Sequence, residues 1–63
     1  MPWDEDYYPR SMRYLAPPVR AKAIAIANAL LAEGHEEGSA IRIAIARAKE
    51  WAMRHGLLPE DKR

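Results

Sequence analysis

The spacing of apolar positions predicts a first long helix over about residues 18–33. Apolar side chains recur there at helical intervals and fill one broad side. The opposite side holds Ala21, Ala25, Asn28, Ala29 and Ala32. Pro17-Pro18 favours a helix start, because proline fits the first helical turn. Gly34 favours a helix end, because glycine readily adopts the left-handed conformation that follows many helices.

A second amphipathic pattern predicts a helix over about residues 36–55, ended by Gly56. One side carries Ala40, Ile41, Ala44, Ile45, Ala48, Trp51, Ala52 and His55. Charged residues fill most of the other side. The link to residues 18–33 is so short that the two helices must run antiparallel. We therefore predict an all-α fold built on an antiparallel helical hairpin.

The remaining segments complete a single small domain over residues 1–63. Residues 1–9 are acidic and aromatic, and we predict an extended arm. A short helix within residues 10–15 should then pack across the hairpin together with the arm. Residues 56–63 are predicted to form a flexible tail. No strand is expected, because the chain has no Thr, one Val and no alternating apolar run.

Composition limits the interior of this domain. Hydrophobic residues make up 49% of the 63 residues, but 12 of them are Ala, and Leu, Ile and Val together number 11. A core this thin cannot enclose an enzyme-type cavity. We expect it to depend on Trp3, Tyr8, Leu15, Leu30, Ile41, Ile45 and Trp51.

The chain's location is predicted to be cytoplasmic. It has no Cys and therefore none of the disulfides that usually stabilise small secreted domains. Its start is acidic rather than basic and apolar, unlike a signal peptide. The longest charge-free apolar stretch, residues 23–32, is about half of what a membrane span needs. A net charge of +1 also argues against strong attraction to polyanions.

No residue pattern points to catalysis. His35 and His55 are the candidate general bases, and neither has a nucleophile at a recognisable spacing. We therefore predict a protein that is not an enzyme, with no catalytic residues, no cofactor and no metal ligands. The acidic turn Glu33–Gly38 could sense a divalent cation, although its spacing is not that of an EF-hand. Helix capping and a turn are the simpler interpretation of that segment.

Two surface sets on the second helix are candidate contacts. Arg42, Arg47, Lys49 and Arg54 could bind phosphates of a nucleic acid or another anion, although such charges are ordinary on a solvated helix side. Ile43 and Met53, with Ala46 between them, could form a small patch for a protein partner. Single exposed apolar residues are nevertheless common on protein surfaces.

An ordered series of short motifs runs along residues 1–53. It consists of Met1-Pro2-Trp3, Tyr8-Pro9-x-Ser11-Met12, Leu15, Pro17-Pro18, Lys22-Ala23-Ile24, Ile26-Ala27-Asn28-Ala29-Leu30, Glu33-Gly34, Glu37-Gly38, Ala40-Ile41 and Ala48-Lys49-Glu50-Trp51-Ala52. This series resembles the N-terminal segment of small uncharacterised bacterial proteins of the YdaT type.

A smaller set of residues is similar to the ChaB-like family, small helical proteins labelled as cation transport regulators. The set comprises Met1-Pro2, Pro9-x-Ser11, Ala27-Asn28, Glu36-Glu37, Ala40, Ala44 and Lys49. The link between the long helices is shorter here, and the Trp expected near Ile45 is absent. This resemblance implies a compact helical domain and brings no catalytic residues with it.

These observations favour a non-enzymatic cytoplasmic interaction or regulatory module. Its partner would be an unidentified protein or a second copy of the chain. One alternative is a weak nucleic-acid-binding protein that uses the basic side of the second helix. Another alternative is a cation-responsive regulator that uses the acidic turn.

Overall fold

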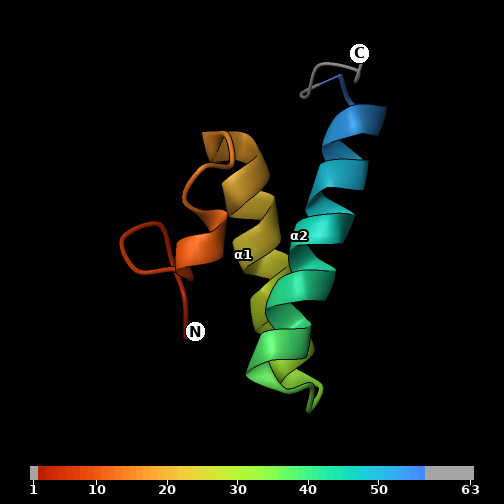
Figure 1. Cartoon of the computed structure of the whole chain (residues 1–63). Coiled ribbons are helices and arrows are strands. Elements are labelled where there is room, and N and C mark those ends of the chain that lie inside the picture. The colour runs from red at the N-terminus through yellow and green to blue at the C-terminus, as the bar shows by residue number, and fades with distance from the viewer. Residues whose placement is uncertain (1, 57–63) are drawn as a thin grey trace.

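The structure is a computed structural model that describes residues 2–56. Two helices, α1 (Pro17–Ala32) and α2 (Glu37–Arg54), pack side by side in opposite directions. A single 3-10 turn, η1 (Arg10–Met12), lies against α1 on the side away from α2 (Figure 1). The described residues contain no strand, only an isolated bridge between Asp4 and Tyr7. The predicted all-α hairpin is therefore confirmed, with helix boundaries within one residue of those expected.

The ends of α1 follow from its local sequence. Pro17 and Pro18 occupy its first turn, where the missing N–H groups would have no helical partner. At the other end Gly34 has a φ of 100°. Its N–H donates to the carbonyl of Leu31 at 3.0 Å, and the N–H of His35 donates to that of Leu30 at 3.1 Å. This pair of bonds is a Schellman motif, and it turns the chain toward α2.

Gly34, between the helices, and Gly38, in the first turn of α2, should respond oppositely to substitution by alanine. Gly34→Ala is expected to lower the free energy of unfolding by about 1 kcal/mol, because a side chain is strained at positive φ. Gly38→Ala should raise it by roughly 0.5–1 kcal/mol, because Gly38 lies inside α2 and open space surrounds its α-carbon. Urea denaturation followed by circular dichroism measures both. If both substitutions changed the free energy of unfolding by the same amount in the same direction, the result would contradict the positive φ of Gly34.

A ridge of four alanines forms the α2 side of the helix contact. Ala40, Ala44, Ala48 and Ala52 recur every four residues, and each is 0% exposed. Such a ridge lets two helix backbones approach closely. Toward the open end of the hairpin the helices diverge (Figure 1). Trp51 lies there, half-buried, with the Nζ of Lys22 from α1 5.2 Å from the centre of its ring.

α1 is covered on two sides rather than one. Its buried residues are Val19, Ala23, Ile24, Ala27, Asn28 and Leu30. α2 covers the side of α1 that carries Lys22. The N-terminal arm covers the side of α1 that carries Arg20 and Asn28. Asn28, assigned to the side of the helix opposite the apolar arc, is therefore buried. Ala21, Ala25, Ala29 and Ala32, assigned to the same side, are exposed.

Asn28 holds the arm in place. Its Nδ2 donates to the carbonyl of Trp3 at 3.0 Å, and its Oδ1 accepts from the N–H of Trp3 at 3.3 Å. The arm is not extended throughout, because Asp4 and Tyr7 close a tight turn. In that turn the Asp4 Oδ1 accepts from the N–H groups of Asp6 and Tyr7, both at 2.9 Å. Only Gly56 of the predicted tail falls among the described residues.

The core lies where it was predicted, but fewer large side chains are buried in it than expected. Of the seven residues expected to dominate it, Trp3, Leu15 and Leu30 are buried. Tyr8, Ile41, Ile45 and Trp51 are half-buried at its edge. Met12 and Val19 are the largest fully buried side chains. His55, predicted on the same side of α2 as Trp51, is exposed, and its ring is tilted by 39° against the Trp51 ring, with ring centres 5.2 Å apart.

Candidate interaction surfaces

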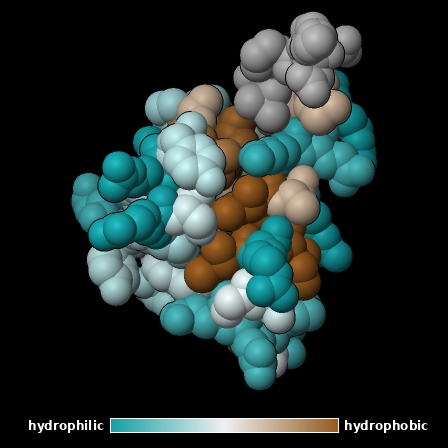
Figure 2. Space-filling view, in the orientation of Figure 1, coloured by the Kyte–Doolittle hydropathy of each residue, from teal (hydrophilic) through white to brown (hydrophobic). Residues whose placement is uncertain are grey.

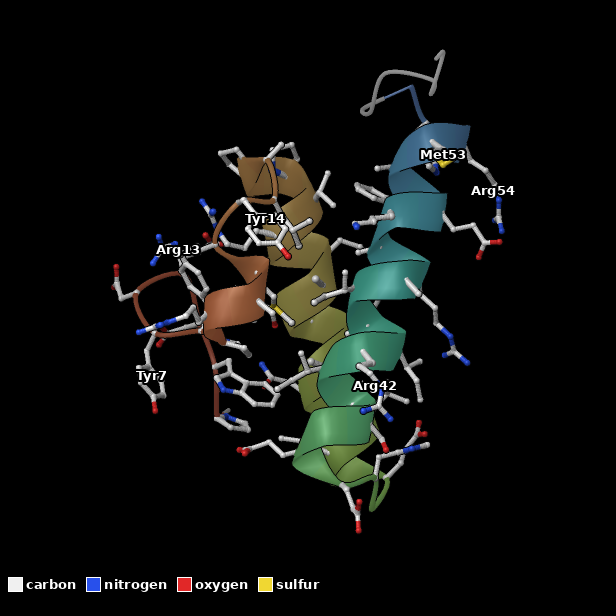
Figure 3. All side chains as sticks on the ribbon, viewed as in Figure 1. Tyr7, Arg13, Tyr14, Arg42, Met53 and Arg54 are labelled. Atoms are coloured by element: carbon white, nitrogen blue, oxygen red, sulfur yellow. The ribbon has the colours of Figure 1, made fainter. Side chains whose placement is uncertain are left out.

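The four basic residues predicted on α2 do not share one side. All are exposed. Arg42 and Lys49 are seven residues apart and so lie above one another, as do Arg47 and Arg54. The two pairs are separated by roughly 140° around the helix axis. Figure 3 shows Arg42 and Arg54 pointing in different directions. Arg54 also pairs with Glu50, with Nη2 3.7 Å from Oε1.

The predicted apolar patch on α2 is discontinuous. Ile43 is half-buried and Met53 is 59% exposed. Ten residues separate them, which corresponds to about 15 Å along the helix. Ala46 is exposed between them, and Glu50 lies on the same outward side. This geometry provides two separate apolar points rather than a surface.

The acidic turn between the helices is solvent-exposed from Glu33 to Gly38. Its backbone groups cap both helices: the N–H of Glu33 donates to α1 carbonyls, and the carbonyl of Glu36 accepts from Ala40 at 2.8 Å. Across residues 2–56, no three His, Asp or Glu side chains gather closely enough to hold a metal ion.

Apolar side chains also reach the surface where α1 and α2 meet. Figure 2 shows them as one area bordered by polar residues. Half-buried residues of the two helices that pack against the core are Ile26, Leu31, Ile41, Ile45 and Trp51. Their partial burial shows that this area is mainly the edge of the hairpin's own core.

The outer side of α1 is unusual because it carries no charge. Ala21, Ala25, Ala29 and Ala32 are exposed along it, and we call these four residues the outer α1 face. Between residues 21 and 32 the one charged side chain is Lys22, at the edge of this face. The exposed side of a surface helix normally carries charged or polar residues. A helix that is apolar nearly all round is typical of one buried between other elements.

A further surface lies on η1, and the sequence patterns did not predict it. Arg10, Ser11, Arg13 and Tyr14 line an open hollow of about 510 Å³, which we call the η1 hollow. The available signal was the three-residue spacing of Arg10 to Arg13 and of Ser11 to Tyr14 just after a proline. In a 3-10 turn, side chains three residues apart lie on the same side. The sequence favoured one or two ordinary helical turns there, in which side chains three residues apart are also neighbours, so the spacing alone did not single out a hollow.

Comparison with known proteins identifies one relative of this chain. Over 52 residues, 60% are identical between the two proteins, and the match covers 82% of the chain. The chain is similar to the uncharacterized protein YdaT of Bacillus subtilis (strain 168). The match spans only 35% of YdaT, about a third of its length. The resemblance to the YdaT type is thus confirmed, and it brings no activity with it. No family model matches the chain, and no solved structure does.

Neither described helix has both the length and the apolar character needed to cross a membrane.

Proposed function

We propose that this chain is a non-enzymatic cytoplasmic interaction module whose immediate partner is a second copy of itself. The observation that supports the proposal is the uncharged outer α1 face. Two such faces can pack together without removing a charged group from water, which would otherwise oppose association. Alanines spaced by four also allow close approach of helix backbones, as the ridge on α2 does within the hairpin.

Charge placement favours an antiparallel pairing of the two α1 helices. Lys22 and Glu33 lie on the same edge of the outer α1 face, near its opposite ends. When two identical helices pair antiparallel about the middle of this face, the position of Lys22 in each copy lies opposite Glu33 of the other. The Lys22 ammonium would then turn from the Trp51 ring of its own copy to that carboxylate. Two symmetric ion pairs then flank an apolar contact, which is the arrangement of a two-fold symmetric dimer.

The size of the face limits the strength of the dimer. α1 has 16 residues and is therefore about 24 Å long. A contact formed by one helix from each copy falls at the small end of specific interfaces, where complexes are weak and transient. We therefore expect dimers at high micromolar concentration and monomers at low micromolar concentration, which suits a regulated association.

A regulatory role and a distant relationship to ChaB-like proteins form part of the same proposal. Their support is the motif similarity of the sequence together with the compact helical hairpin. Neither brings a catalytic or metal-binding residue to this chain.

Sedimentation velocity at increasing protein concentration tests the dimer. Ala25→Glu places a carboxylate at the centre of the outer α1 face, and it should weaken association at least tenfold through like-charge repulsion and desolvation. Ala46→Glu is the matched control, because Ala46 is also an exposed alanine, but on α2. It should leave association unchanged. A wild-type chain that remains monomeric at high micromolar concentration would overturn the proposal.

A further inference from the structure

We propose that the η1 hollow binds a nucleoside phosphate, either as a free nucleotide or as an unpaired nucleotide of a single-stranded nucleic acid. The four residues that line the hollow supply two guanidinium groups, two hydroxyl groups and one aromatic ring. Its volume, about 510 Å³, is within the range of small-molecule sites. This inference is independent of the outer α1 face.

The two arginines can act together on one phosphate. Arg10 opens η1, and Arg13 is the residue that caps it three positions later, so their side chains leave the turn on the same side. Both are exposed. Within residues 2–56 neither makes an ion pair with a carboxylate, and the Asp4–Asp6 carboxylates do not line the hollow. Uncompensated guanidinium pairs are well suited to phosphate, which they can bind in a bidentate manner.

The backbone of the η1 hollow is held rigidly. Met12 and Leu15 are buried in the core beneath it. From α1, the Nη1 of Arg20 donates to the carbonyls of Arg13 at 3.0 Å and Leu15 at 3.1 Å. The same guanidinium lies 4.9 Å from the centre of the Tyr8 ring. A ligand would therefore meet a fixed backbone, and binding would order the four exposed side chains that line the hollow.

Tyr14 supplies the contact that distinguishes a nucleotide from a bare anion. Its side chain is one of the four that line the hollow, and it is 78% exposed, so its ring is available for stacking. Figure 3 shows the Tyr14 side chain at the surface. Bases of single-stranded nucleic acids stack on exposed aromatic rings, whereas a free phosphate gains nothing from them. The hydroxyls of Ser11 and Tyr14 can also donate to phosphate or sugar oxygens.

Fluorescence anisotropy with a labelled ten-nucleotide oligothymidylate measures this binding at low salt. Arg10→Ala, Arg13→Ala and Tyr14→Ala should each weaken it about fivefold or more, the lower end of what one stacked base contributes. Arg42→Ala is the control for a lost arginine and Tyr7→Ala for a lost exposed tyrosine on the arm, because neither lines the hollow. Both controls should bind like the wild type.

Salt dependence and competition identify the ligand. One phosphate neutralised by the two arginines gives a slope of log affinity against log salt of about −0.7 for a single strand, and each arginine variant should make that slope shallower. Displacement of the oligonucleotide by thymidine monophosphate would show that a free nucleotide suffices. Displacement only by unlabelled oligonucleotide would assign the site to single strands, and both outcomes support the proposal.

Three results would overturn it: no binding at low salt, equal loss in the Arg42 and Arg13 variants, or equal competition by inorganic phosphate and thymidine monophosphate. A phosphotyrosine peptide that competes better than either nucleotide form would assign the hollow to a protein ligand and likewise reject it. Thermal melts of each variant check that the fold is kept. Ala25→Glu should bind the oligonucleotide normally, so failure of the dimer and failure of this site are distinguishable.

Discussion

Ala44→Leu should lower the free energy of unfolding by about 3 kcal/mol, a large part of the stability that a domain of this size can have. Ala44 is 0% exposed, and it lies in the alanine ridge of α2 that faces α1. Three added carbon atoms cannot fit there unless the helices move apart. Moving them apart would also remove the contacts of Ala40 and Ala48 on either side. Urea denaturation followed by far-ultraviolet circular dichroism measures the loss.

Ala46→Leu is the matched control for this substitution. Ala46 lies two residues further along the same helix and is exposed. Leucine and alanine have similar helix propensities, so the change should alter the free energy of unfolding by less than about 0.5 kcal/mol. If Ala44→Leu and Ala46→Leu lowered the free energy of unfolding by the same small amount, there would be room for a leucine between the helices. The close contact of α1 and α2 along the alanine ridge would then be contradicted.

The hairpin was predictable because its determinants are local. Apolar spacing defined the two helices, and Pro17, Pro18 and Gly34 defined the ends of the first. A short link then left only an antiparallel arrangement. Within the hairpin, the alanine ridge on α2 is fully buried. Each of these inferences depends on residues within a few positions of one another.

The position of the arm could not be predicted from the same kind of signal. Trp3 and Asn28 are 25 residues apart, and their pairing depends on which side of α1 the arm covers. On a helical projection Asn28 falls beside the exposed alanines, opposite the apolar arc, and nothing in that pattern indicates that Asn28 is buried. Burial of an amide is acceptable only when its groups are hydrogen-bonded, and the arm satisfies that condition.

The surface sites show the same division between local and non-local information. Exposure of the charged residues on α2 was predicted from the pattern of α2, but their separation into two pairs required counting turns between them. The η1 hollow depends on a 3-10 turn rather than an α-helical one, a difference of one residue in hydrogen-bond spacing. Apolar periodicity cannot resolve that difference over three residues.

Asn28→Leu should lower the free energy of unfolding by about 2–3 kcal/mol, even though leucine has the same number and branching of side-chain heavy atoms as asparagine. Asn28 is 5% exposed, and it makes both of its hydrogen bonds to the backbone of Trp3. Without the amide, the N–H and carbonyl of Trp3 either remain buried without partners or leave the core together with the Trp3 ring. Leaving a buried donor or acceptor unpaired costs about 1–3 kcal/mol for each group.

Tryptophan fluorescence separates these two outcomes. The chain has two Trp residues, so the measurement uses a Trp51→Phe background in which only Trp3 emits. Release of the arm exposes Trp3, which is 6% exposed in the structure, and its emission should shift to the red before global unfolding. Asn28→Ala adds a cavity to the same loss of hydrogen bonds, so it should destabilise the fold at least as much as Asn28→Leu. An Asn28→Leu protein with wild-type stability and unshifted emission would show that apolar contact alone, and not the amide, holds the arm against α1.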